Sequence, residues 1–140
     1  MCIRDRVTPS DYPTEMIGDN AKKFRQLGLG YTNLGALLMA LGLAYDSDEA
    51  RSLAAVITAI MTGEAYKTSS QIAARLGPFE GYELNKEAML SVLNAHREAI
   101  ADIPVNEAVP PALRAAAVEV WGNVIPVSYT HLTLPTNREV

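Results

Sequence analysis

The residues of this chain that could bind a phosphate or a nucleotide follow a pair of glycines. Gly28 and Gly30 stand at alternate positions, and Tyr31 and Asn33 come soon after them. A dinucleotide-binding loop needs a third glycine three residues after the second, so that helix and strand can approach each other closely. Position 33 is asparagine instead. The spacing therefore favours tight backbone packing at a strand-to-helix corner over nucleotide binding.

Three acidic residues near position 47 could be taken for a metal site. They are Asp46, Asp48 and Glu49. Calcium loops need a longer alternation of oxygen ligands than this. Asp46 with Glu49 three positions later fits a capping box, and carboxylates are favourable at the positive end of a helix dipole. The pattern predicts a helix cap at Asp46 and no metal site.

The remaining candidates for acid–base or nucleophilic chemistry are a histidine and two serines. His96 has no partner cysteine and no serine nucleophile with an acid behind it. Ser69 and Ser70 fall inside a predicted helix, where no sharp turn presents a hydroxyl. We therefore predict no catalytic residue, and we interpret His96 as structural or exposed.

The elements that position these residues are predicted to be helices joined by one extended passage. Thr14 can cap a short helix that ends near Phe24. Residues 28–31 are too rich in glycine to start a helix and too few to form a sheet of their own, and Asn33 can cap the helix that follows. Gly42 then acts as a stop signal. The expected inner face of this second helix consists of Leu34, Leu37, Leu38 and Leu41.

The longest predicted helix begins at Asp46 and stops at Gly77-Pro78, with Gly63 as a possible bend. It would span roughly 45 Å, which suits the outside of a large barrel. Asn85 is the predicted cap of the next helix, and Pro110-Pro111 suit the first turn of the last one. Apolar residues at helical spacing predict core contacts: Met61, Met89, Val92, Leu93, Ile100, Leu113, Ala116, Ala117, Val120 and Trp121. His96 falls near the same helix face as Met89.

Composition narrows the class of protein. The chain has 140 residues, the size of one domain, and is 49% apolar but only 6% aromatic. Alanine-rich helices bury little apolar area per residue, so their stability depends on packing against larger neighbouring elements. There is no apolar run long enough for a membrane span and no Cys/His spacing typical of metal sites. The formal net charge of −4 and the absence of a basic run argue against nucleic-acid binding. We expect a cytoplasmic protein.

Both ends of the chain have the character of translated adapter DNA. The codons ATG TGT ATA AGA GAC AGR encode residues 1–6, and their reverse complement contains GTC TCT TAT ACA CAT, which encodes residues 127–131. The shared DNA resembles a transposon end used in sequencing libraries. We therefore predict three parts: adapter sequence at 1–6, authentic protein at 7–126, and adapter sequence at 127–140. Cys2, the only cysteine, and His131 then fall outside the authentic part.

Two long sequence segments resemble a known protein family. RQLGLGYTNLGALLMALGLAYDSDE covers residues 25–49, and GEAYKTSSQIAARLGPFEGY covers residues 63–82. Together they closely resemble the catalytic chain of adenosylcobalamin-dependent (class II, vitamin B12-dependent) ribonucleotide reductases, over about residues 11–125. The specificity lies in many ordered residues and not in one short motif.

The resemblance implies an internal fragment of a catalytic chain. That family folds as a ten-stranded α/β barrel and makes deoxyribonucleotides by a cysteine thiyl radical, formed when the carbon–cobalt bond of adenosylcobalamin breaks. Its Asn-Pro-Cys-Gly-Glu and Pro-Thr-Gly-Thr motifs, which carry the radical cysteine and bind the substrate phosphates, are both absent here. The expected fold is therefore mainly α in the isolated chain, as a helical segment of that barrel, and the fragment alone is expected to be inactive.

The resemblance also implies partners for the full-length protein. They are a ribonucleotide substrate, a thiol reductant, the rest of the barrel and a second subunit in a homodimer, without nucleic acid or membrane. Tyr31 and Asn33 are weak candidates for contact with corrin or substrate at the mouth of a barrel strand. The simpler interpretation, a packing role for Tyr31 and a cap at Asn33, is favoured. Two alternatives stay open: a free-standing helical interaction module, and a fragment of an iron-dependent (class I) reductase.

Overall fold

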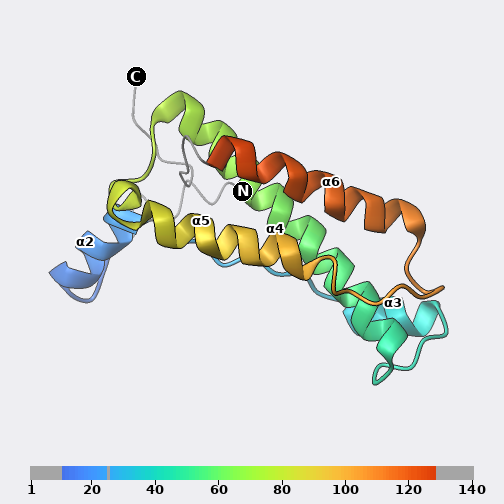
Figure 1. Ribbon diagram of the computed structural model, residues 1–140. Helices are drawn as coiled ribbons and strands as arrows, with labels where there is room; N and C mark the ends of the chain where they lie inside the picture. The colour runs from blue at the N-terminus through green and yellow to red at the C-terminus, as the bar shows by residue number, and fades with distance from the viewer. Residues whose placement is uncertain (1–10, 25, 129–140) are drawn as a thin grey trace.

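The computed structural model describes residues 11–24 and 26–128, with side chains up to Val124. All regular structure in these ranges is helical, without a strand. The helices are α2 (Glu15–Phe24), α3 (Leu34–Ala40), α4 (Asp48–Leu76), α5 (Tyr82–Ala99) and α6 (Pro111–Ser128). Figure 1 shows α4, α5 and α6 side by side, with α2 and α3 toward opposite ends of the molecule. The expectation of a mainly helical chain is confirmed, whereas the predicted strand-to-helix passage at residues 28–31 contains no strand.

The first helix begins as predicted. The Thr14 hydroxyl accepts a hydrogen bond from the backbone N–H of Ile17 at 3.3 Å, which satisfies one of the free donors of the first turn. Lys22 and Lys23 lie in the last turn, where positive charge is favourable. Phe24 ends the helix, and its ring contacts Phe79 at a centroid distance of 6.2 Å.

The long helix ends as predicted but is capped by a different residue. It stops at Leu76, and Gly77 follows with a φ of 85°, a conformation that side chains rarely adopt. The cap is Ser47 and not Asp46, because the Ser47 hydroxyl accepts from the backbone N–H of Ala50 at 3.1 Å. The cap therefore lies one position after the predicted Asp46, and the capping box predicted for Asp46 and Glu49 is wrong.

The next helix starts three residues before its predicted cap. It begins at Tyr82, and Asn85 lies inside the first turn, where its side-chain amide donates to the carbonyl oxygen of Gly81 at 2.8 Å. Tertiary packing explains the earlier start: Tyr82 is fully buried, and its ring meets Phe79 edge-on at 5.5 Å. Val92, predicted to face inward, is 48% exposed, and Leu90 is buried instead.

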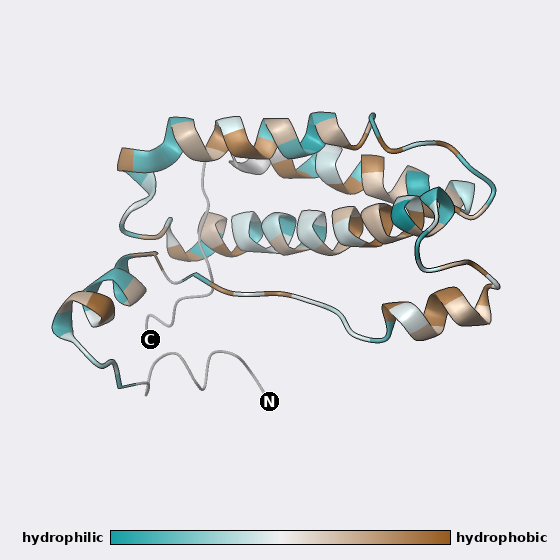
Figure 2. Ribbon diagram, turned by 90° about the horizontal axis from the view of Figure 1, so that it is seen from below, coloured by the Kyte–Doolittle hydropathy of each residue, from teal (hydrophilic) through white to brown (hydrophobic). Residues whose placement is uncertain are grey.

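The short helix α3 buries a narrower face than its leucine pattern suggested. Leu38 is buried and Leu34 packs against the core, but Leu37 and Leu41 are exposed. Gly42 follows with a φ of 70°, in agreement with its predicted role as a stop signal. Figure 2 shows α3 as a largely hydrophobic helix that stands apart from the layer of long helices.

The core lies between the long helices, and α4 and α6 form its closest pair. Trp121, Val120 and Ala117 of α6 are buried, as are Leu93 and Ile100, which confirms these predicted positions. Met89 and Leu113 are partly buried against the same cluster. The fully described core cluster comprises Leu38, Ala50, Leu53, Val56, Tyr82, Leu90, Leu93, Ile100, Val109, Ala117, Val120, Trp121 and Val124.

Gly63 is the point of closest approach between α4 and α6. A Cβ atom there would overlap Val120 Cγ1 and lie 2.9 Å from Trp121 Nε1, so no larger residue fits without movement. The helix runs without interruption from Asp48 to Leu76 through this position. The role of Gly63 is therefore to admit α6, where the sequence had suggested a bend.

Candidate functional site

Tyr31, the first of the two candidate contact residues, reaches α4. Its hydroxyl lies 2.9 Å from Thr58 Oγ1 and 3.4 Å from the carbonyl oxygen of Ala54. Thr58 Oγ1 also lies 2.8 Å from the Ala54 carbonyl oxygen, to which it donates. Tyr31 is therefore joined to α4 by hydrogen bonds at the surface of this structure, and contact with corrin or substrate in the parent stays a prediction.

Asn33, the second candidate, precedes α3 but does not cap it with its side chain. It is the one non-glycine residue with positive φ in the described part of the chain, at φ 66° and ψ 20°. Asparagine tolerates this left-handed region better than most residues. Asn33 is the N-cap residue of α3, as predicted, but no hydrogen bond joins its side chain to the first turn. The helix instead begins with the Asn33 carbonyl oxygen, which accepts from the Leu37 N–H at 3.0 Å.

The glycine pair beside these residues is not tightly packed. A Cβ atom added at Gly28 or Gly30 would meet nothing within 4 Å, and neither glycine has positive φ. The prediction of close backbone packing at this corner is therefore wrong in this structure. The reason is that the backbone here runs over the surface and not beneath another element.

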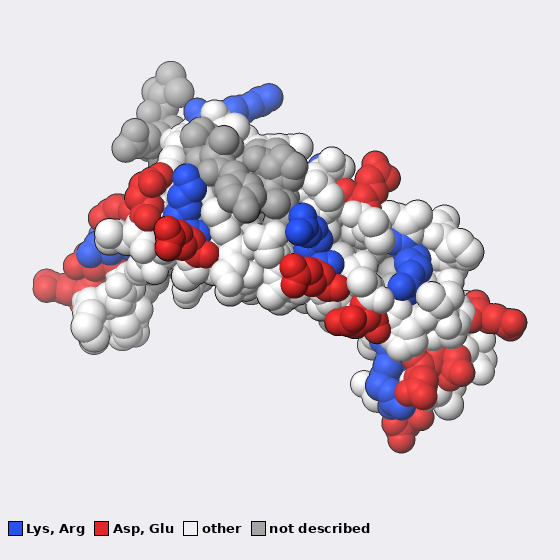
Figure 3. All heavy atoms as spheres, in the orientation of Figure 1, with Lys and Arg blue, Asp and Glu red and all other residues white. Residues whose placement is uncertain are grey.

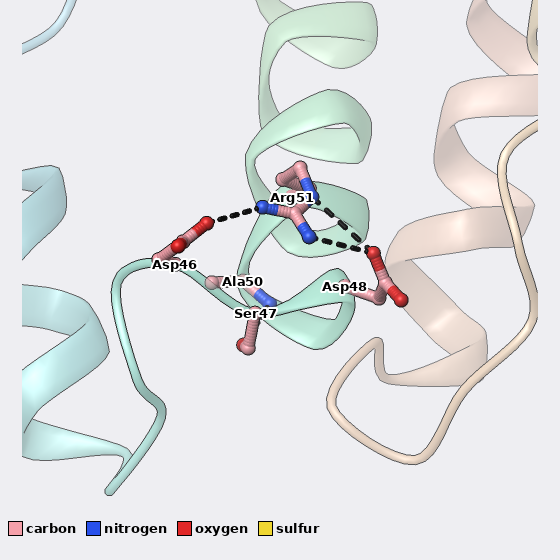
Figure 4. Close-up of polar contacts among 5 residues, drawn as sticks. All are labelled: Asp46, Ser47, Asp48, Ala50 and Arg51. Atoms are coloured by element: carbon pink, nitrogen blue, oxygen red, sulfur yellow. Dashed lines mark hydrogen bonds and ion pairs between the residues drawn. The ribbon is translucent and has the colours of Figure 1, made fainter.

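Two of the three acidic residues near position 47, Asp46 and Asp48, pair with an arginine. Arg51 donates through Nη1 to Asp46 and through Nη2 to Asp48, both at 2.8 Å (Figure 4). These hydrogen bonds, first that to Asp48 and then that to Asp46, raise the pKa of Arg51 above its ordinary value. All three side chains are well exposed, so the cluster is a surface ion pair network at a helix start.

His96 lies against the core tryptophan. Its ring centroid is 5.8 Å from that of Trp121, and Tyr66 lies on the same indole at 6.1 Å. His96 is exposed to solvent. Ser69 and Ser70 are buried in the middle of α4, and the Ser70 hydroxyl donates to the Lys67 carbonyl oxygen at 2.8 Å. The Ser70 hydroxyl is thus bonded within its own helix, whereas the aromatic partner of His96 lies on α6.

Titratable residues do not gather elsewhere in the described residues. Within 11–24 and 26–128 no group of three or more His, Cys, Asp and Glu side chains could hold a metal ion. The helices described there are too short or too polar to cross a membrane. Figure 3 shows basic and acidic side chains interspersed over the face it presents.

Two residues that complete this region were missed in the sequence. Thr58, the partner of Tyr31, stands in the middle of a long helix, where no local pattern signals a long-range contact. Ser47, the cap of α4, could have been recognised, because serine is among the preferred capping residues and two acidic residues follow it.

The sequence of the chain matches a known protein family. A family model described as "Ribonucleotide reductase, barrel domain" matches residues 3–121. The chain therefore belongs to the ribonucleotide reductase barrel-domain family.

Relatives with longer chains share this segment. A vitamin B12-dependent ribonucleotide reductase of Streptantibioticus cattleyicolor is 47% identical over 116 residues, which is 83% of this chain and 19% of the relative. The protein of the same name in Streptomyces coelicolor has the same identity over 12% of its length. That of Rhodopirellula baltica is 46% identical over 121 residues, 86% of this chain and 11% of the relative. This chain thus spans less than a fifth of the length of these relatives.

Proposed function

We propose that this chain is a helical segment of the catalytic barrel of an adenosylcobalamin-dependent ribonucleotide reductase. The parent protein would make deoxyribonucleotides from ribonucleoside diphosphates or triphosphates, in the cytoplasm, with a thiol reductant. The observation that carries the proposal is the identity of 47% to a protein named for dependence on vitamin B12, over 83% of this chain. When bound, adenosylcobalamin would supply the radical.

The surface of the chain supports the view that it is one part of a larger barrel. Residues 26–45 contain no charged side chain. Several large apolar side chains in that stretch are nevertheless exposed, including Leu29, Met39 and Tyr45 at 54%, 76% and 73%. Monomeric proteins rarely leave such surface uncovered. We infer that neighbouring parts of the ten-stranded α/β barrel cover it in the parent.

The extended backbone of residues 26–33 fits a barrel strand that lacks its neighbours. These residues are not helical, and among the described residues their backbone takes part in only one backbone–backbone hydrogen bond, from Leu37 N–H to Asn33. A strand needs paired neighbours to satisfy its backbone groups. In the parent we expect adjacent strands to supply them, with Tyr31 and Asn33 at one end as the candidate contacts to cofactor or substrate.

The fragment alone is proposed to be catalytically inactive. Thiyl-radical chemistry needs a cysteine, and the one cysteine of the chain, Cys2, has none of the surrounding residues of the family motif. The test is to assay ribonucleotide reduction by the purified chain with adenosylcobalamin and a dithiol. We expect no turnover, and measurable turnover would overturn the proposal.

Folding of the isolated segment is a separate expectation. Because much apolar surface is left uncovered, we expect marginal stability. Circular dichroism tests this, and a cooperative melt above about 60 °C would contradict it.

The alternatives differ from the proposal in what they require. An iron-dependent reductase needs a small-subunit gene, so the recovered genomic locus discriminates: an adjacent gene of that kind would favour the iron class. A free-standing helical module needs a core of its own, and α4, α5 and α6 do share one. The exposed residues on α3 and the much greater length of the relatives favour a barrel segment over such a module. Sedimentation of the full-length parent tests the proposed homodimer.

A further inference from the structure

The turn between α4 and α5 contacts the last residues of α2 (Figure 1). The ring of Phe24 lies 6.2 Å from that of Phe79, measured between centroids. The backbone N–H of Gly81 donates to the carbonyl oxygen of Lys23 at 3.3 Å, which satisfies one of the carbonyls that a helix leaves free at its end. Two separate contacts therefore join α2 to this turn.

Gly81 leaves room for the Phe24 ring. A Cβ atom at Gly81 would overlap Phe24 Cε1 and lie 2.9 Å from Cδ1 of the same ring. Gly81 has a φ of −79° and a ψ of 0°, a turn conformation that most residues can adopt. Space for the ring, and not the backbone, therefore calls for glycine at this position.

The turn is itself fixed to the core. Phe79 meets the ring of Tyr82 edge-on at 5.5 Å, and Tyr82 is fully buried in the core cluster. The Gly81 carbonyl oxygen also accepts from the Asn85 side chain at 2.8 Å. Phe79, Gly81 and Tyr82, termed the seat below, therefore give Phe24 a defined place on the helical core.

Residues 26–33 start beside the seat and lead into a helix that is also anchored. Leu38 of α3 is 2% exposed, and Leu34 packs against the core cluster. Figure 2 shows the segment between α2 and α3 as one extended trace. An extended chain reaches at most about 3.3–3.6 Å per residue, so it has no slack when both ends are held. The two anchors therefore fix the position of this segment along its own axis.

We propose that Phe24 and Gly81 are positioning residues for residues 26–33, and that the seat sets the register in which this segment pairs as a barrel strand. The contacts of the seat lie within the chain and need no neighbouring strand, whereas the step to the barrel rests on the proposed function. Tyr31 and Asn33 share one face of such a strand. A slip of one residue would turn both to the other face, which the seat prevents.

The first test measures the docking of α2 by amide hydrogen exchange in the 140-residue chain. A helix of 10 residues is marginal by itself, so α2 is protected only while it is docked. Gly81→Ala fills the seat, and overpacking of this kind changes an equilibrium constant about 5- to 160-fold. We expect exchange in α2 to accelerate within this range, with exchange in α6 as in wild type, because α2 is released without global unfolding.

A double-mutant cycle identifies the Phe24 ring as the cause. Leucine lacks Cε1 and Cζ, so in a Phe24→Leu background Gly81→Ala should change exchange in α2 by less than about 2-fold. Gly81 is also the N-cap of α5, and any capping effect appears in both backgrounds and cancels. Gly122→Ala is the matched control, because nothing lies within 4 Å of a Cβ atom at Gly122, and it must behave as wild type.

Three results of this first test would overturn the docking of α2. They are an unprotected α2 in wild type, equal exchange of α2 in wild type and Gly81→Ala, and an equal acceleration in both backgrounds of the cycle.

The second test measures positioning in the full-length reductase. Gly81→Ala should lower kcat by about 10- to 100-fold, since misplacing active-site groups by about 1 Å has an effect of this size. Adding Phe24→Leu to Gly81→Ala should restore most of kcat, which a general loss of stability would not allow. Wild-type kcat in Gly81→Ala would overturn the positioning role. A wild-type parent without reductase activity would instead overturn the proposed function, and the docking result would stand.

Discussion

The indole N–H of Trp121 donates to the carbonyl oxygen of Ala59 at 2.9 Å, across 62 positions of the chain. This bond joins α6 to the middle of α4, one turn before Gly63. A buried indole normally finds such a partner, because an unpaired N–H in the core is costly. The contact fixes the register between the two helices, which explains why Gly63 must be free of a side chain.

Replacing Gly63 with alanine should destabilise the chain. The new Cβ atom would overlap Val120 and crowd Trp121, and such overpacking costs about 1–3 kcal/mol, more than the gain in helix propensity of about 1 kcal/mol. Gly122→Ala is the matched control, since Gly122 lies in α6 with nothing within 4 Å and is exposed. It should stabilise by about 0.5–1 kcal/mol. Urea unfolding measures both, and a stabilised Gly63→Ala would contradict the close approach.

Replacing Ser47 with alanine should weaken the start of α4. Loss of the hydrogen bond to the Ala50 N–H costs about 1 kcal/mol, as is usual for a capping serine. Asp46→Ala removes only an exposed partner of Arg51, and its smaller effect should disappear at high salt. Thermal unfolding at two salt concentrations separates the roles. A larger loss of stability for Asp46→Ala than for Ser47→Ala would show that Asp46 is the cap.

Alkaline pH should destabilise the fold through Tyr82. Burial, and then the negative charge of Glu83, raise the pKa of this phenol above its ordinary value near 10. The neutral phenol is therefore favoured in the folded state, and its contribution is present below pH 10 and is lost as the pH rises through the folded pKa. Denaturation followed between pH 8 and about 11 measures this loss.

The control for that measurement is a pair of variants. Tyr82→Phe should flatten the alkaline decrease in the free energy of unfolding, whereas Tyr45→Phe should leave it unchanged because Tyr45 is exposed. An identical decrease in wild type and Tyr82→Phe would show that other tyrosines or lysines cause it.

The terminal segments are predicted to be absent from the natural gene. Residues 1–6 and 129–140 lie outside the described residues, so the prediction rests on the shared codons alone. Sequencing the locus from unfragmented genomic DNA should give different codons before residue 7 and after residue 126. Continuation of the present codons in the natural reading frame would refute the adapter interpretation.

Local signals in the sequence predicted most helix ends correctly. The Thr14 cap and the stops at Gly42 and Gly77 depend on neighbouring residues, and each is where expected. The start of α5 was misplaced because Phe79 packs on both Tyr82 and Phe24, and local capping preference cannot reveal such tertiary contact.

The candidate site was less predictable for the same reason. The sequence indicated that Tyr31 packs, but not that its partner is Thr58, which stands 27 residues later in a helix. The glycines at 28 and 30 looked like a packed corner and are open. The family resemblance was predictable, because it depends on many ordered residues over most of the chain.

The pairing of α4 with α6 has a consequence for biosynthesis. Gly63 is translated well before Val120 and Trp121, which pack against it, and the whole of α5 emerges from the ribosome in between. During that interval the apolar side of α4 lacks the helix against which it packs in the folded chain. A nascent chain stalled before α6 has emerged from the ribosome should therefore recruit chaperones, and one in which α6 is fully outside should release them.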